Sequence, residues 1–163
     1  MMTNQYMTKP DFDLDTSYAG YGFIQQIMEM NMTYGQPVED TPILRGDVAT
    51  RLKNFKKILL DEVNEVDDII KAVESDSTPS EVALTSIADW LGDTIIYCTS
   101  EMVKYGLPPL AVLQIIMASN FSKLDENGKP ILDETGQKFM KGPNYWKPEP
   151  MIEDLLRTLA EDV

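Results

Sequence analysis

Two long stretches of helical pattern, separated by a break of only a few residues, constrain the fold of this chain more than any other feature. Apolar residues recur every three or four positions across residues 47–74 and again across 78–105, which is the periodicity of a helix with one face toward a core. Residues 75–77, Ser-Asp-Ser, interrupt the pattern. The sequence therefore predicts an all-α protein, a helical bundle built around these two helices.

The second of these helices carries signals at both ends. Thr78 is placed to be the N-cap, Pro79 fits the first helical position, and Glu81 completes a capping box. Gly106 follows as a C-cap, with Pro108 just beyond it. These residues predict a helix that begins at Thr78 and ends just before Gly106.

The rest of the chain is divided into shorter elements by glycine and proline. Asn127-Gly128 and Thr135-Gly136 are turn signals on either side of an apolar pair, so a small hairpin is predicted there. A length of 163 residues suits one domain. Within this single domain, 1–163, the other predicted elements are a loose arm at 1–14, a helix from Asp15 or Ser17 to Thr33, a helix at 109–121, the hairpin-like excursion at 122–150 and a last helix at 151–160.

Acidic residues interrupt the apolar faces of both long helices. Glu62 and Glu65 are three residues apart in the first, and Asp89 and Asp93 are four apart in the second, so each pair projects from one side of its helix. A carboxylate on an apolar face is costly unless a positive charge compensates it. If the two faces meet, four carboxylates converge, and this arrangement predicts a divalent-metal site.

The acids of the first helix are not equivalent. With each residue advanced by about 100°, Glu62 falls inside the apolar stripe, and Glu65 lies at its edge with Asp61. Asp67 points away from the stripe and is placed to pair with Lys71 at i+4, as solvated helical acids often do. Only some of these acids are therefore candidates for a site.

Histidine is absent, and Cys98 is the single cysteine. Without histidine the chain cannot form a Ser-His-Asp or Cys-His catalytic group or a His-ligated zinc site. One cysteine cannot form an intrachain disulfide or a Cys-rich zinc site, and Cys98 is expected to be a small core residue. The metal must be held by oxygen ligands, which favours Mg²⁺, Mn²⁺ or Ca²⁺.

The net charge is −13, from 14 basic and 27 acidic residues. An acidic chain without a large basic cluster is a poor candidate for binding duplex nucleic acid. No apolar run reaches the roughly 18 residues that a membrane span requires. No signal peptide is seen at the N-terminus, so a cytoplasmic location is expected.

The acidic motif and the residues that follow it resemble the all-α nucleoside triphosphate pyrophosphohydrolases, in particular the MazG-like and phosphoribosyl-ATP pyrophosphohydrolase-like branch. The acidic motif together with these later segments identifies this family more specifically than the acids alone. Two positions depart from MazG-type motifs, because Asp61 replaces a glutamate and Trp90 stands where an acid is usual, with Asp89 one residue earlier. The matching segments are Glu62-x-x-Glu65, Ile87–Tyr97, Ala118–Leu124, Gly128-Lys129-Pro130 and Lys138–Pro143.

The resemblance implies Mg²⁺-dependent cleavage of a (d)NTP or related nucleotide between its α and β phosphates, with Mn²⁺ as a substitute metal. It implies that Glu62, Glu65, Asp89 and Asp93 hold the metal, and that Glu62, Glu65 or Asp61 acts in catalysis. It also implies a homodimer or a dimer of dimers whose subunits complete the helical core together. The expected substrate-binding residues are Asn120, Lys123, Lys141, Arg51, Tyr145 and Trp146.

Two other functions fit the same residues. The substrate can be phosphoribosyl-ATP instead of a (d)NTP. The chain can also be a non-enzymatic helical module whose acids bind Ca²⁺ or a basic partner. A general house-cleaning role, the removal of non-standard or surplus nucleotides, is one form of the first function.

Overall fold

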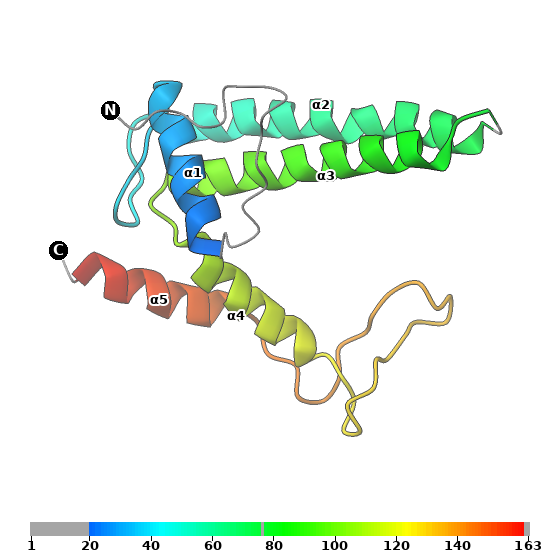
Figure 1. The fold of residues 1–163 in the computed structure, drawn as a ribbon. Helices are drawn as coiled ribbons and strands as arrows, with labels where there is room; N and C mark the ends of the chain where they lie inside the picture. The colour runs from blue at the N-terminus through cyan, green and yellow to red at the C-terminus, as the bar shows by residue number, and fades with distance from the viewer. Residues whose placement is uncertain (1–19, 76, 162–163) are drawn as a thin grey trace.

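The chain is all-helical, as the sequence predicts (Figure 1). The computed structural model describes residues 20–75 and 77–161, so the predicted arm at 1–14 and the predicted start of the first helix lie outside the described residues. No helix in this described part is long and apolar enough to cross a membrane. The five helices of the described residues are α1 Gly20–Thr33, α2 Val48–Glu74, α3 Ser80–Val103, α4 Pro109–Phe121 and α5 Glu149–Glu161.

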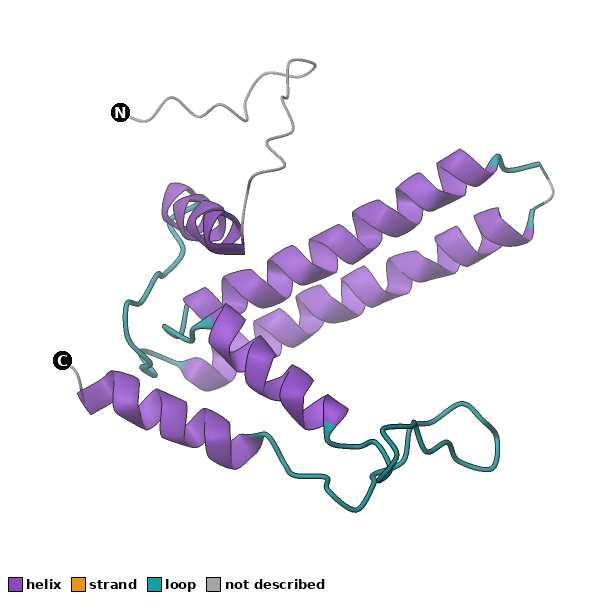
Figure 2. Cartoon of the chain, turned by 60° about the horizontal axis from the view of Figure 1, so that its bottom comes forward, coloured by secondary structure: helices purple, strands orange, loops and turns teal. Residues whose placement is uncertain are grey.

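Helices α2 and α3 form a long antiparallel hairpin, and their contact is the most extensive between any two helices of the described chain (Figures 1 and 2). The Asp47 side chain accepts a hydrogen bond of 3.0 Å from the Thr50 backbone N–H, so Asp47 is the N-cap of α2. The predicted bounds of this helix are therefore confirmed.

The predicted N-cap of α3 is wrong by one residue, and the helix ends at Val103 rather than just before Gly106. Pro79, with an extended backbone (ψ 143°), is the capping residue, and it makes no side-chain cap hydrogen bond. The capping box of Thr78 and Glu81 does not form, because Pro79 lies outside the helix rather than at its first position. The backbone carbonyl of Pro79 instead accepts hydrogen bonds from the N–H groups of Val82 and Ala83.

Cys98 is exposed, so its predicted place in the core is wrong. It lies on the side of α3 that also carries the exposed Leu91 and Ile95. Apolar sequence around a residue did not imply burial here, because this side of α3 contacts no other described helix.

A buried polar pair joins α1 to α3. Asn31 is 1% exposed; its Nδ2 donates to the Ser100 backbone carbonyl at 3.2 Å, and its Oδ1 accepts from the Ser100 hydroxyl at 2.6 Å. Ile27 on α1 and Val103 on α3, each about one turn from a member of this pair, are also buried. The reciprocal bonds fix the position of α1 on the C-terminal half of α3.

Replacing Asn31 with alanine is expected to lower the free energy of unfolding by about 1–3 kcal/mol, because the Ser100 hydroxyl is left buried without a partner. Urea unfolding followed by circular dichroism measures this loss. Gln25→Ala, at an exposed position of the same helix, is the matched control. Equal stability of the two variants would contradict this account of the α1–α3 contact.

Helix α4 has the predicted bounds, and α5 begins two residues earlier than predicted. Between them, residues 122–148 form the predicted excursion. Its hairpin is minimal, with one antiparallel bridge between Leu132 and Phe139 and no strand among the described residues. Both figures show this excursion leaving the end of α4 on a course separate from the α2–α3 hairpin (Figures 1 and 2).

Candidate functional site

Four acids face the same side of the α2–α3 hairpin, and we call Glu62, Glu65, Asp89 and Asp93 the acidic patch. Glu62 lies between the two helices with only 6% of its surface exposed, whereas the other three acids are exposed. The prediction that Glu62 lies within the apolar stripe of its helix is confirmed. Asp61 is exposed on the same helix.

The surroundings of Glu62 oppose its negative charge. Burial raises the pKa of its carboxyl, and the charges of Glu65, Asp93 and Asp89 raise it further. Its Oε1 atom is buried and has no hydrogen-bond partner among the described residues. In the same part of the chain none of the four acids forms an ion pair. The patch therefore has an uncompensated negative charge at its centre.

A metal bound by oxygen atoms suits this donor set. All four side chains are carboxylates, which Mg²⁺ prefers, and the unpartnered Oε1 of Glu62 gives an acceptor with no competing donor. Across residues 20–75 and 77–161, however, no three Asp, Glu or Cys side chains are grouped closely enough to hold a metal ion as they stand. The residues fit the ion by their chemistry, and the exposed three have rotamer freedom that Glu62 lacks.

Trp90 is a residue of this site that sequence reasoning missed. Its indole N–H donates a hydrogen bond of 2.9 Å to the backbone carbonyl of Glu62. This bond joins α3 directly to the α2 residue at the centre of the patch. A signal was present in the sequence, because Trp90 occupies the position at which the MazG-type motifs that the sequence resembles carry an acid.

The expected ion pair on α2 is replaced by another, and a glycine of α3 lies in open surroundings. The expected pairing of Asp67 with Lys71 is wrong, because Lys71 instead bonds Asp68 at 2.7 Å, one turn away. Gly92 is open, since an added Cβ would meet nothing within 4 Å among the described atoms. No helix of the same described chain therefore uses Gly92 for a close approach.

Five of the six predicted substrate-binding residues gather at the end of α4, and we call them the lysine cluster: Asn120, Lys123, Lys141, Tyr145 and Trp146. Lys123 Nζ donates to the Asn120 side chain at 2.7 Å, and Lys141 Nζ lies 4.6 Å from the centroid of the Tyr145 ring. The two lysines come from opposite ends of the 122–148 excursion, so only the fold brings them together.

Backbone bonds hold the lysine cluster in place. The Gly142 N–H donates to the Lys123 carbonyl at 2.9 Å, next to Lys141. Trp146 is tied to α4 through its backbone, since Ser119 donates to its carbonyl at 2.8 Å and its N–H donates to the Ser122 hydroxyl at 3.2 Å. These bonds explain why the serines of Ser119-Asn120-Phe121-Ser122-Lys123 accompany the lysines.

Arg51 is not part of either group. It lies eleven residues before Glu62 on α2, about 16 Å along the helix axis. Its guanidinium lies 5.1 Å from the centroid of the Tyr105 ring and donates to the Lys104 carbonyl at 3.4 Å. Nearby, Lys104 pairs with the buried Glu101 at 3.2 Å. The structure therefore places Arg51 in a contact between α2 and the end of α3.

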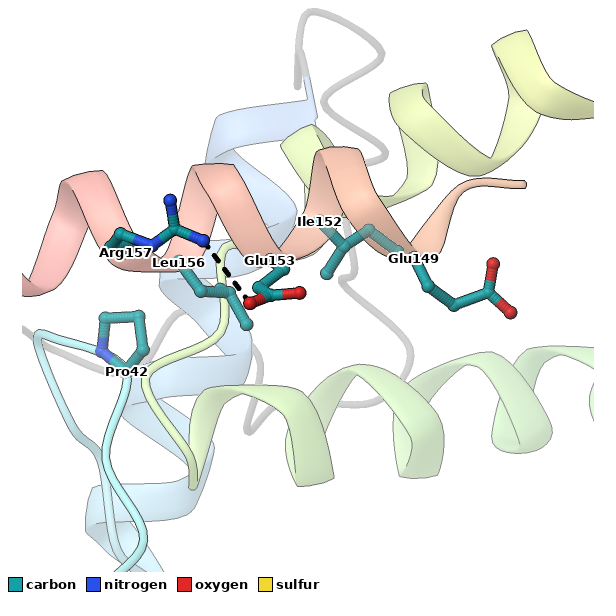
Figure 3. Close-up of a pocket in the computed structure, with 6 residues that line it drawn as sticks. All are labelled: Pro42, Glu149, Ile152, Glu153, Leu156 and Arg157. Carbon is teal, nitrogen blue, oxygen red and sulfur yellow. Dashed lines mark hydrogen bonds and ion pairs between the residues drawn. The ribbon is translucent and has the colours of Figure 1, made fainter. Parts of the chain in front are cut away.

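Two surface hollows of the described residues lie elsewhere on the molecule. One of about 620 Å³ separates α5 from Pro42, and Arg157 pairs with Glu153 along its wall at 3.3 Å (Figure 3). A second, of about 460 Å³, adjoins it and is lined mainly by apolar side chains, with Leu156 shared by both. Neither hollow includes a residue of the acidic patch or the lysine cluster, so neither is the candidate site.

The chain is similar to solved structures, one of which is described here, but not to a known family or a curated protein. No protein-family model matches the chain, and no curated protein matches it. The solved structure is that of a protein from Exiguobacterium sp. 255-15, provisionally named an NTP pyrophosphohydrolase. It is 21% identical to this chain with a TM-score of 0.48, and the match covers 86% of this chain and 98% of the other.

Proposed function

We propose that this protein is a Mg²⁺-dependent nucleotide pyrophosphohydrolase that cleaves the α–β phosphate bond, releasing a nucleoside monophosphate and pyrophosphate. The observation that carries the proposal is the buried, unpartnered carboxyl of Glu62 surrounded by three further acids. A patch of this kind needs a cation, and a nucleotide triphosphate normally arrives with one bound. The sequence motifs that accompany the patch, described above, support the same reaction.

The acidic patch would hold the metal. Glu62, Glu65, Asp89 and Asp93 supply the carboxylate oxygens, and Trp90 fixes the backbone of Glu62 from the opposite helix. When bound, Mg²⁺ would activate a water molecule and offset negative charge that develops on the phosphates. Glu65 or Asp61 would accept the proton that this water loses as it attacks phosphorus, while the bridging α–β oxygen leaves with the electrons of the bond that breaks.

The lysine cluster would bind the other end of the substrate. Lys123 and Lys141 would pair with phosphate oxygens, and the Asn120 amide would bond the base or sugar. Tyr145 supplies a ring face for stacking, which in the structure already lies against a cation. Trp146 is more firmly bound to α4 through its backbone, so we assign it to positioning this segment.

A substrate panel tests the proposal. Purified protein is incubated with Mg²⁺ and each of the common and modified (d)NTPs, and separately with phosphoribosyl-ATP, and pyrophosphate is measured. We expect pyrophosphate together with the matching monophosphate, and no product after EDTA is added. Release of orthophosphate would instead place cleavage at another bond. No turnover of any nucleotide, with Ca²⁺ binding retained, would favour the non-enzymatic alternative.

A substitution at Gly142 tests the lysine cluster without changing any residue of the acidic patch. A Cβ at this position would overlap the backbone carbonyl of Leu124 and lie 2.7 Å from that of Lys123. Gly142→Ala should therefore move Lys141 away from Lys123 and lower kcat/KM by on the order of 100-fold, the effect of a misplaced binding group. Steady-state kinetics measure the loss, and Mg²⁺-dependent thermal stabilisation should be unchanged.

Gly136→Ala is the matched control for Gly142→Ala. Gly136 lies in the same excursion, with φ +71° and no atom within 4 Å of an added Cβ, so substitution adds local strain without a collision. Its kcat/KM should stay near that of the wild type. Equal losses in both variants would show that the excursion as a whole, rather than the spacing of the two lysines, had been disturbed.

A further inference from the structure

We propose that Trp90 is a positioning residue of the acidic patch, which sets the affinity of the patch for a divalent cation without touching the ion. Its indole N–H, bonded to the Glu62 backbone carbonyl, holds the Glu62 carboxyl where the other acids can close on the same cation. This inference rests on the proposed function, and it adds to that function a residue that binds neither the metal nor the nucleotide.

The hydrogen bond itself is the first argument. The Trp90 Nε1 atom lies 2.9 Å from the Glu62 carbonyl oxygen, a favourable distance for such a bond, and it joins residues 28 positions apart. Among the described residues it is the only side-chain hydrogen bond between α2 and α3. Arg51 also donates from α2, but to the Lys104 carbonyl beyond the end of α3. A polar contact at Glu62 thus fixes the register of the two helices.

The second argument is that the position of the Glu62 carboxyl depends on its own backbone. The residue is 6% exposed, and among the described residues no hydrogen bond to Oε1 holds the carboxyl. A carbonyl oxygen has two lone pairs, so the Glu62 carbonyl can accept the indole bond in addition to an intrahelical one. Glu65, Asp89 and Asp93 are exposed and can change rotamer. Holding the buried ligand in place before the cation arrives reduces the ordering that binding requires.

The third argument is charge. Trp90 directly follows Asp89 in the sequence and precedes Asp93 by three residues on the same helix. A further acid at this position would add negative charge close to Glu62, which three acids already surround. The indole is neutral and acts only as a donor. Trp90 therefore joins α3 to α2 without adding to the repulsion within the acidic patch.

Replacing Trp90 with 3-benzothienylalanine tests the hydrogen bond alone, because this residue has the shape of tryptophan with sulfur in place of the N–H group. Amber suppression introduces it at position 90 only. The dissociation constant for Mn²⁺ is measured from the electron paramagnetic resonance of the free ion. We expect it to rise by about 10–100-fold, as is usual when a group that supports a metal ligand is lost. Trp90→Phe, which also lacks the donor, should give a loss in the same range.

Thr85→Val is the matched control. The Thr85 hydroxyl donates to the Glu81 backbone carbonyl at 2.8 Å, so this variant also loses a side-chain bond to a carbonyl, but one within α3. Its affinity for Mn²⁺ should equal that of the wild type. Wild-type affinity in the 3-benzothienylalanine protein would overturn the proposal, because the ring rather than its N–H would then be what matters. An equal loss in Thr85→Val would overturn it too, since any weakening of α3 would then suffice.

Nuclear magnetic resonance of the indole groups gives a second readout. The chain has two tryptophans, so ¹⁵N labelling gives two indole N–H signals, and Trp90→Phe identifies the one from Trp90. We expect Mg²⁺ to shift the Trp90 signal, because an ion bound by Glu62 acts on the residue whose carbonyl accepts this N–H. A Trp90 signal that saturating Mg²⁺ leaves in place would contradict the proposal.

Activity separates this inference from the proposed function. In both Trp90 variants the Mg²⁺ concentration for half-maximal turnover should rise in step with the Mn²⁺ dissociation constant, while kcat at saturating Mg²⁺ stays near that of the wild type. A wild type that binds Mn²⁺ but releases no pyrophosphate would contradict the proposed function alone, and the Mn²⁺ affinities would still decide the role of Trp90. A wild type that binds no Mn²⁺ would overturn both.

Discussion

Replacing Glu62 with glutamine is expected to lower kcat by at least about 100-fold, while making the metal-free protein more stable to heat. The amide has nearly the same shape as the carboxyl but carries no charge, so it cannot serve as an anionic ligand. Changes even to residues that only support a metal ligand commonly cost 10–100-fold, and loss of a ligand should cost at least that much. Steady-state pyrophosphate release measures the effect.

The opposite effect on stability follows from the surroundings of this side chain. Burial and the three neighbouring acids raise the pKa of Glu62 above its ordinary value of 4.5, so its ionised form destabilises the fold. The glutamine variant should therefore unfold at a higher temperature than the wild type in EDTA. Because the raised pKa destabilises the fold only where Glu62 ionises, this advantage should disappear below pH 4.5 and grow as the pH rises through the folded value.

Added Mg²⁺ should reverse the difference in unfolding temperature, so that the wild type becomes more stable than Glu62→Gln. A ligand that binds only the folded state raises its stability, so Mg²⁺ should raise the unfolding temperature of the wild type much more than that of the variant. Asp67→Asn is the matched control, since it removes one negative charge from an exposed position of the same helix. If Asp67→Asn behaved like Glu62→Gln, the effect would be one of net charge rather than of a site.

Gly106→Ala is expected to be the most destabilising single substitution outside the acidic patch. Gly106 follows α3 with φ +65°, a conformation that costs an alanine about 1–2 kcal/mol. A Cβ there would also overlap the backbone carbonyl of Thr41, which belongs to the segment crossing the end of α3. Since backbone atoms cannot move aside as a flexible side chain can, we expect a total loss of about 3 kcal/mol or more.

Gly128→Ala isolates the first of these effects, the strain of the left-handed backbone conformation. Gly128 has a similar backbone conformation, φ +74°, but an added Cβ would meet nothing within 4 Å. Its substitution should cost only the conformational strain, about 1–2 kcal/mol. Urea unfolding of the two variants gives the difference, and equal losses would rule out the contact with Thr41 as the cause.

The segment around Thr41 also shows why Gly106 is required. The Ile43 N–H donates to the Tyr105 carbonyl at 3.0 Å, and the Glu39 N–H donates to the Val103 carbonyl at 3.3 Å. These bonds hold the α1–α2 connection against the end of α3. The sequence predicted Gly106 as the C-cap, whereas the C-cap of α3 is Lys104 and Gly106 lies two residues beyond it. Only the structure shows that a second segment of backbone, at Thr41, occupies the space beside Gly106.

The sequence predicted much of the fold because helices are formed by residues close together in the chain. The bounds of α2 and α4 were predicted from apolar spacing and from glycine and proline between the elements, and the structure shows Asp47 as the N-cap of α2. The start of α3 was missed, because Thr78 and Glu81 suggest a capping box and the extended conformation of Pro79 excludes it. Two competing local signals could not be ranked without the backbone.

The burial of Glu62 was also predictable, because the position of a residue on a helix depends only on its own helix. The roles of Trp90 and of the Asn31–Ser100 pair were not, since each joins residues that are 28 or 69 positions apart. The same holds for the meeting of Lys123 with Lys141 at the end of α4. Such contacts are set by how whole helices pack.

The sequence by itself thus determined that this protein is helical, lacks the residues for histidine or zinc chemistry, and has an acid where its second helix should be apolar. The tertiary structure decided which acids surround that one, which indole bonds its backbone, and that the lysines lie together beyond the end of α4. The physical reason is the separation in sequence of the residues involved. Periodicity and residue chemistry depend on residues close together in the chain. Burial between helices and the distance between two charged groups are set only when helices far apart in the sequence pack together.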